Sequence, residues 1–96
     1  MTLVLKKFSA DWCAPCRKME PIIDSFEKMN FIKVEKIDIE DQPDVAQKFN
    51  IRSIPALIWV KKQPDGEEIV VDLHVGMCSL EKLVETTNDN LSRNPK

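Results

Sequence analysis

The chain has 96 residues, of which 43% are hydrophobic and 31% are charged, as in soluble globular chains with a single core. Fourteen basic and sixteen acidic residues give a net charge of −2, and their spread along the sequence argues against a nucleic-acid or anionic-lipid surface. The longest apolar run, residues 54–60, includes a proline and is far shorter than the roughly 20 residues that span a bilayer. We therefore expect one domain over residues 1–96, with no nucleic-acid or membrane partner.

The first half of the chain predicts a strand, a helix and a second strand. Residues 3–8 form a short apolar run that ends in a polar turn, as a strand does. Over residues 14–30 apolar side chains recur every three or four positions, which predicts an amphipathic helix. Pro15 suits its first turn, whereas Pro21 lies inside it and predicts a kink, because proline removes a backbone donor. Residues 31–39 alternate apolar and charged side chains and predict an edge strand.

The second half predicts a short helix, a pair of strands and a last helix. Pro43 opens the short helix, which extends to about residue 50. Residues 55–60 and 68–74 predict two strands, because the Pro64-Asp65-Gly66 segment between them is a strong turn signal. The two strands are therefore expected to form a hairpin.

Ser79 is expected to cap the last helix, which reaches about Leu91. Residues 92–96 are expected to be frayed. The predicted order is strand, helix, strand, helix, strand, strand, helix (βαβαββα).

Two cysteines, Cys13 and Cys16, stand on either side of Ala14 and Pro15, between the first strand and the first helix. The start of a helix has unpaired N–H groups and the positive end of the peptide dipole, and both favour a thiolate. Cys13 is therefore the expected nucleophile. Cys16, one turn further on, can form a disulfide with Cys13 and release the group that is covalently bound to Cys13. The pair predicts a redox site.

Half of a zinc site is the alternative interpretation of this pair. A full site needs further ligands, and the remaining candidates are Cys78, His74 and carboxylates without the usual paired spacing. We expect His74 to be a partly exposed strand residue beside no obvious partner. Cys78 is expected to be a small buried side chain, and a regulatory or dimer-forming role for it stays open.

The number of cysteines and the first residues of the chain favour a cytoplasmic location. Three cysteines are too few for a secreted fold held together by disulfides, and a paired CxxC in a reducing compartment indicates redox or metal chemistry. The start of the sequence has no secretory signal pattern.

Spaced features extend the motif well beyond the two cysteines. They are FSADWCAPCRK at residues 8–18, Pro21, IRSIPA at residues 51–56, and Gly76. Together they resemble the thioredoxin family, over about residues 3–91. The resemblance implies a thioredoxin-like α/β fold, with a minimal four-stranded mixed sheet flanked by three helices. It also implies a protein disulfide oxidoreductase.

The resemblance also implies roles for the residues of the site. Cys13 attacks, and Cys16 is buried and resolves the mixed disulfide, while Trp12 shields the dithiol. The Ile54–Pro55 peptide is cis, packs against the sulfurs and presents the Ile54 backbone to an extended substrate strand. Gly76 lines the same groove. Pro15 between the cysteines is more similar to reducing than to oxidising members.

The partners implied by the resemblance are protein disulfide substrates and a reductase that recycles the dithiol. That reductase is either thioredoxin reductase or a glutathione system. No metal and no cofactor is required, since the redox group is the Cys13–Cys16 disulfide itself. We expect a monomer that contributes to cell redox homeostasis.

The chain departs from the family pattern in two ways. Only twelve residues precede Cys13, whereas members usually carry a further strand and helix there, and the loss makes the strand at residues 31–39 an edge. Members also usually carry an aspartate six residues before the attacking cysteine, where this chain has Lys7. Lys36 matches the usual partner of that aspartate, so one of two neighbouring lysines is a candidate neutral proton acceptor. Alternatively, Lys7 reaches solvent from an open sheet.

Two other functions stay open from the sequence. The short architecture favours a glutaredoxin-like, glutathione-dependent reaction, although Trp12 and the Cys-Ala-Pro-Cys segment argue against it. The absent aspartate favours a non-catalytic adaptor that grips partner proteins with the groove around Trp12, Ile54 and Gly76. The retention of both cysteines argues against an adaptor.

Overall fold

The computed structural model describes residues 2–92. Along the chain these residues form β1 (Thr2–Ser9), α1 (Ala14–Lys28), β2 (Lys33–Asp38), α2 (Pro43–Lys48), β3 (Ala56–Lys62), β4 (Glu68–Val75) and α3 (Leu80–Ser92). The predicted order is confirmed, and the boundaries differ by one or two residues. Ser92 ends α3, and the rest of the expected frayed end lies outside the described residues. No helix within residues 2–92 is long and apolar enough to cross a membrane.

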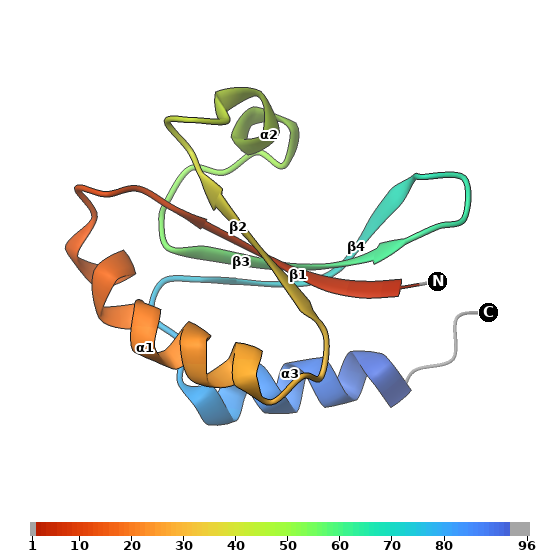
Figure 1. Ribbon diagram of the computed structural model, residues 1–96. Helices are drawn as coiled ribbons and strands as arrows, with labels where there is room; N and C mark the ends of the chain where they lie inside the picture. Colours follow the sequence, from red (N-terminus) through yellow and green to blue (C-terminus); the bar gives the residue numbers. More distant parts are fainter. Residues whose placement is uncertain (1, 93–96) are drawn as a thin grey trace.

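The strands form one mixed sheet in the order β2-β1-β3-β4. β2 runs parallel to β1, while β3 is antiparallel to both β1 and β4. Helices α1 and α3 cover one face of this sheet and α2 covers part of the other (Figure 1). The expected four-stranded mixed sheet is thus confirmed, and β2, with its alternating charges, lies at an edge as predicted.

Alternation along the strands divides the core between the two faces of the sheet. Toward α1 and α3 lies a cluster built on Leu5, Met19, Ile23, Phe26, Leu57, Trp59 and Leu83. Toward α2 lies a second cluster of Val4, Phe8, Ile37, Ile58 and Val60, against which Val45, Ala46 and Phe49 pack. Trp59 is fully buried, and its Nε1 donates to Thr87 Oγ1 at 2.9 Å, which ties β3 to α3.

The helix ends mostly follow the sequence signals. Pro15 lies in the first turn of α1, and Pro21 lies inside that helix, which nevertheless continues to Lys28; the kink at Pro21 stays a prediction. Ser79 Oγ accepts a hydrogen bond from the Lys82 N–H at 3.1 Å. The predicted cap of α3 is therefore confirmed.

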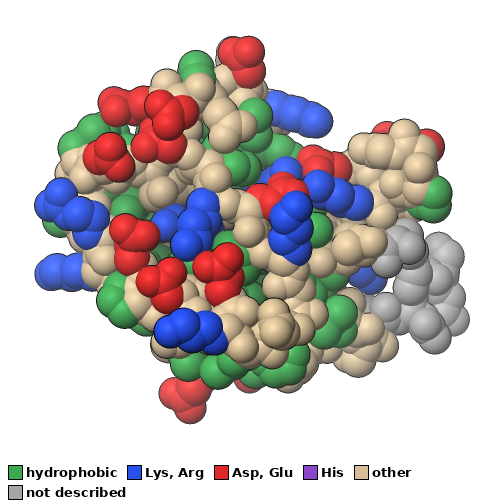
Figure 2. All heavy atoms as spheres, in the orientation of Figure 1, with side chains coloured by type: hydrophobic (Ala, Val, Ile, Leu, Met, Phe, Trp, Pro, Cys, Tyr) green, Lys and Arg blue, Asp and Glu red, His purple; other side chains and the backbone are tan. Residues whose placement is uncertain are grey.

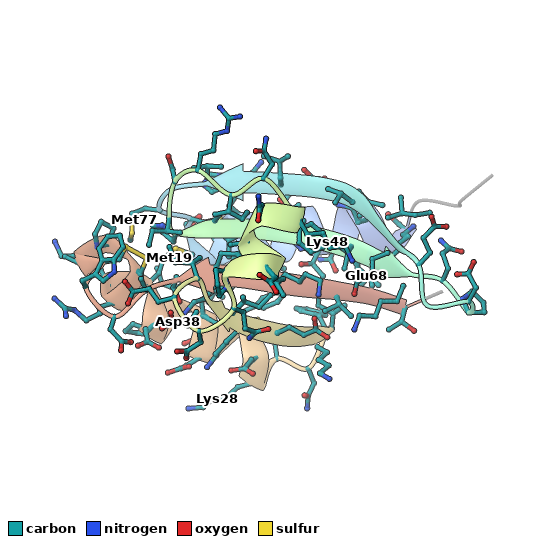
Figure 3. All side chains as sticks on the ribbon, turned by 90° about the horizontal axis from the view of Figure 1, so that it is seen from above. Met19, Lys28, Asp38, Lys48, Glu68 and Met77 are labelled. Carbon is teal, nitrogen blue, oxygen red and sulfur yellow. A yellow bond between two sulfur atoms is a disulfide. The ribbon has the colours of Figure 1, made fainter. Side chains whose placement is uncertain are left out.

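Charged side chains from all four strands meet on the α2 face of the sheet. Lys6 Nζ lies 2.7 Å from Glu35 Oε1 and 3.3 Å from Glu68 Oε2, and Lys62 Nζ lies 2.7 Å from Glu35 Oε2. Glu68 lies toward the β3–β4 hairpin, at the opposite end of the sheet from Met77 and Asp38 (Figure 3). We call Lys6, Glu35, Lys62 and Glu68 the four-strand ion cluster. On the face shown in Figure 2, acidic and basic side chains are interspersed and do not form one large patch of a single sign.

The four-strand ion cluster predicts an acid-sensitive contribution to stability through Glu35. Burial opposes its ionisation, but hydrogen bonds and charges from Lys6 and Lys62 outweigh burial and hold the pKa of Glu35 below its ordinary 4.5. The stabilisation is therefore present above pH 4.5 and is lost as the pH falls through the lower folded-state pKa.

Chemical denaturation of wild type and Glu35→Gln across this pH range measures the effect. The free energy of unfolding of Glu35→Gln should fall less on acidification than that of wild type. Glu67→Gln, in the exposed hairpin, is the matched control and should retain the wild-type slope. Equal slopes for Glu35→Gln and wild type would contradict the prediction.

Candidate active site

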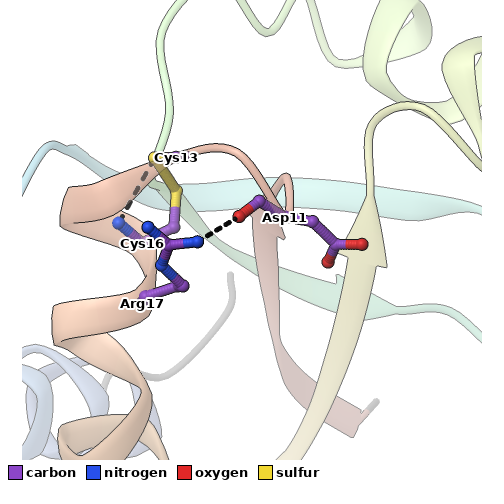
Figure 4. The surroundings of a disulfide bond; sticks show 4 residues. All are labelled: Asp11, Cys13, Cys16 and Arg17. Carbon is purple, nitrogen blue, oxygen red and sulfur yellow. Dashed lines mark hydrogen bonds between the residues drawn. A yellow bond between two sulfur atoms is a disulfide. The ribbon is translucent and has the colours of Figure 1, made fainter.

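Cys13 and Cys16 are joined by a disulfide at the start of α1. After β1 ends, a turn closes when the Cys13 N–H donates to the Ala10 carbonyl at 3.1 Å, which places Cys13 at the N-cap of the helix. There its Sγ accepts a hydrogen bond from the Cys16 N–H at 3.2 Å (Figure 4). Both residues are buried, with exposed fractions of 5% for Cys13 and 2% for Cys16. The helix start therefore offers a donor to the Cys13 sulfur, as the sequence predicts.

Trp12, next to Cys13, lies on the surface. Its side chain is 63% exposed, and Nε1 donates to Glu40 Oε2 at 2.9 Å. Arg17, on the other side of the disulfide, donates from Nη1 to the Asp11 carbonyl at 3.0 Å (Figure 4). Trp12 is thus an exposed residue held beside the disulfide by a carboxylate that the sequence reasoning missed. No local spacing signals Glu40, which is 28 residues away from Trp12.

The loop before β3 brings Ile54 and Pro55 to the cysteines. The Ile54–Pro55 peptide is cis, as the resemblance implies. Ile54 packs against the small cluster formed by Ala10, Cys13 and Cys16. The Gly76 N–H donates to the Pro55 carbonyl at 2.8 Å, so the segment after β4 joins the same site.

Gly76 has a φ of +96°, and a methyl group placed on it would meet no atom within 4 Å. The positive φ of this position, and not a lack of space for a side chain, is therefore the reason that glycine suits it in the free chain.

A pocket of about 400 Å³ opens beside Cys16. Its lining includes Lys7 from β1, Arg17 and Glu20 from α1, and Lys36 and Asp38 from β2. Lys7 is only 3% exposed. Within residues 2–92, its ammonium group has no hydrogen-bond or ion-pair partner, and it is not among the fully buried polar atoms, so solvent in the pocket reaches it. The structure thus places Lys7 and Cys16 on the walls of one pocket.

Lys36 does not fit the predicted role of a neutral proton acceptor. Its Nζ lies 3.2 Å from Glu27 Oε1 and 3.4 Å from Asp24 Oδ1, both on α1. Burial opposes its protonation, but the hydrogen bonds and charges of Glu27 and Asp24 outweigh burial and raise the pKa of Lys36. The two lysines are neighbours across β1 and β2, yet carboxylates compensate the charge of Lys36. Of the two lysines, only Lys7 is without a carboxylate partner within the described residues.

The remaining sequence candidates lie apart from the disulfide. Cys78 is buried in the α1 and α3 side of the core, and burial raises the pKa of its thiol against the opposing charge of Lys82. His74 does have a partner, because its Nε2 lies 2.7 Å from the Met77 carbonyl oxygen; the expectation of none is wrong. In the described part of the chain, no three His, Cys, Asp or Glu side chains gather where they could hold a metal ion.

A disulfide across the first turn of a helix, where the helix start favours a thiolate, is a site suited to thiol–disulfide exchange. The family model described as Thioredoxin matches residues 1–89. The chain therefore belongs to the thioredoxin family, whose members are protein disulfide oxidoreductases.

Individual relatives agree with this assignment. The chain is 39% identical to thioredoxin H2 of Arabidopsis thaliana over 69 residues, which are 71% of this chain and 52% of that protein. It is 38% identical to a thioredoxin of Rickettsia bellii over 92% of this chain and 81% of that protein. The solved structure of Trichomonas vaginalis thioredoxin aligns with a TM-score of 0.79 and 30% identity, over 92% of this chain and 78% of that one. The predicted thioredoxin-like fold class is confirmed, although the chain spans only about half of the Arabidopsis relative.

Proposed function

We propose that this protein reduces disulfide bonds of other proteins, with Cys13 as the nucleophile and Cys16 as the resolving thiol. The hydrogen bond from the Cys16 N–H to Cys13 Sγ at the helix start is the observation that supports this assignment most directly. A donor aimed at sulfur and the positive end of the helix dipole both stabilise a thiolate.

The reaction consists of two exchanges. The Cys13 thiolate attacks one sulfur of the substrate disulfide, forming a Cys13–substrate bond, and the other substrate sulfur leaves as a thiolate. The Cys16 thiolate then attacks the Cys13 sulfur, closing the Cys13–Cys16 bond and releasing the second substrate sulfur as a thiolate. Two electrons pass from the dithiol to the substrate, whose thiolates take protons from water.

The substrate strand is proposed to lie along Trp12, Ile54, Pro55 and Gly76. Trp12 offers an exposed aromatic surface beside the disulfide, and aromatic residues of this kind are favoured at interfaces. The backbone of Ile54 can pair with an extended segment, while Pro55 has no N–H group that would bond the sulfurs. The hydrogen bond between Gly76 and Pro55 holds the two walls of this groove together.

The cellular setting proposed for the chain follows its family. The protein would work as a monomeric single domain in the cytoplasm, without metal or cofactor. A thioredoxin reductase or a glutathione system would return two electrons to the Cys13–Cys16 disulfide.

Disulfide reduction in a small protein substrate tests the proposal with three reductants: dithiothreitol, thioredoxin reductase with NADPH, and glutathione with its reductase. Wild type is expected to accelerate reduction, and Cys13→Ser is expected to lower the rate to that of the reductant alone. Cys78→Ser, a change at a buried thiol in another part of the core, is the matched control and should keep the wild-type rate. A Cys13→Ser protein as active as wild type would overturn the proposal, and the preferred reductant identifies the recycling system.

A further inference from the structure

We infer that the Lys7 ammonium group stabilises the thiolate of Cys16, so that the resolving thiol is activated by a neighbouring charge and not by a proton-accepting side chain. The inference rests on the proposed function for its place in the reaction. It is argued from the pocket beside Cys16, which Lys7 also lines with a largely buried side chain whose ammonium group has no partner within the described residues. Lys7 is thereby a positioning residue for the second exchange.

The two consecutive lysines of β1 have opposite environments. Lys6 points to the α2 face, where Glu35 and Glu68 compensate its charge. Lys7 points to the face of α1, and within the described residues no carboxylate lies within ion-pair distance of it. The stem of Lys7 is buried, but its ammonium group is reached by solvent in the pocket, so its charge is tolerated there without a carboxylate partner. Among the two lysines, only Lys7 has a charge that is left for a ligand or a reacting group.

Of the other charged groups around the pocket, Arg17, Lys36 and Asp38 already have partners. From α1, Arg17 donates to a carbonyl and Glu20 is exposed. From β2, Lys36 is paired with Asp24 and Glu27. Asp38 Oδ1 accepts from the N–H groups of the two residues that follow Ile39. The carboxylate of Asp11 also belongs to the lining.

The redox state of Cys16 decides whether Lys7 gains a partner. In the disulfide, the Cys16 sulfur is uncharged. Once Cys13 is bound to a substrate, Cys16 becomes a thiol in the pocket that Lys7 also lines, and its ionisation creates a negative charge in that pocket. An opposite charge within about 4–6 Å lowers the pKa of an acid by roughly 1–3 units. The proton leaves through the pocket to water, and the thiolate attacks the Cys13 sulfur as described above.

The pKa of Cys16 can be measured on its own in a Cys13→Ser, Cys78→Ser background, by the ultraviolet absorbance of the thiolate against pH. In this background Lys7→Met is expected to raise the pKa of Cys16 by about one unit, which is a tenfold loss of thiolate at neutral pH. Lys7→Arg should leave the pKa of Cys16 close to its value in the background that retains Lys7. Lys28→Met, at the far end of α1 (Figure 3), is the matched control and should change nothing.

The rate at which a mixed disulfide at Cys13 is resolved distinguishes two roles of Lys7: stabilising the Cys16 thiolate by its charge, or accepting the Cys16 proton. Arginine retains the positive charge but cannot accept a proton. We expect Lys7→Arg to resolve at nearly the wild-type rate and Lys7→Met about tenfold more slowly, in proportion to the thiolate. Resolution as slow in Lys7→Arg as in Lys7→Met, or an unchanged pKa of Cys16 in Lys7→Met, would overturn the inference.

Two points keep the test decisive. Circular dichroism melts verify that each variant is folded, and Lys7→Gln replaces Lys7→Met if the latter does not fold. The pKa of Cys16 does not depend on any substrate. A failure of disulfide reduction would therefore contradict the proposed function but not the effect of Lys7 on the pKa of Cys16. An unchanged pKa of Cys16 in Lys7→Met would contradict the inference but not the proposed function.

Discussion

Cys16→Ser is expected to convert the protein from a catalyst into a trap. Cys13 keeps its place at the start of α1 and still attacks a substrate disulfide, but a serine hydroxyl cannot displace the substrate, because it forms no disulfide with the Cys13 sulfur. One substrate molecule should accumulate per protein as a covalent adduct, and multiple-turnover reduction should fall to the rate of the chemical reductant alone. Mass spectrometry without reductant measures the adduct.

The expected adduct is specific to Cys13. Cys13→Ser, Cys16→Ser should form none, although Cys78 is still present, because that thiol is buried and has a raised pKa. Substrate bound to Cys78 in the double variant, or turnover that persists in Cys16→Ser, would contradict the assignment of the two roles.

Trp59→Ala is expected to lower the free energy of unfolding by about 3–5 kcal/mol, the usual cost of truncating a large aromatic core residue. Trp59 is fully buried on the face of the sheet toward α1 and α3, and its Nε1 donates to Thr87. Removing the ring therefore leaves a cavity and a buried hydroxyl without its donor. Urea unfolding followed by circular dichroism measures the loss.

The second tryptophan provides the control for this prediction. Trp12 is largely exposed, so Trp12→Ala should leave the free energy of unfolding within about 0.5 kcal/mol of wild type. Trp59→Phe should fall between the two alanine variants, because it keeps most of the ring volume. Equal losses for Trp59→Ala and Trp12→Ala would show that Trp59 does not anchor the core.

Features of this protein that depend on local sequence could be predicted well. The alternation in β1, the spacing of apolar residues in α1 and the Ser79 cap each act over a few residues, so the pattern alone carries the information. The same is true of the helix start at Cys13, where one turn of helix brings the second cysteine to the first. These local features position most of the site.

Contacts between distant segments could not be predicted. Trp12 bonds Glu40, and Lys36 pairs with Asp24 and Glu27 across the gap between β2 and α1. A list of residues cannot show which carboxylate a lysine reaches, since this depends on how a helix lies over the sheet. The predicted role of neutral proton acceptor therefore does not fit Lys36, although Lys7 and Lys36 are neighbours on β1 and β2 as the resemblance implies.

The four-strand ion cluster also bears on how the strands find their partners. Lys6 stands opposite Glu35, and Lys62 stands opposite Glu68. A shift of any one strand by a single residue would turn its charged side chain to the opposite face, among apolar residues such as Leu5 and Trp59. An unpaired charge buried there costs several kcal/mol. The cluster thus favours the native alignment of the strands, because a sheet with one strand shifted by a residue is destabilised by the unpaired charge that it buries.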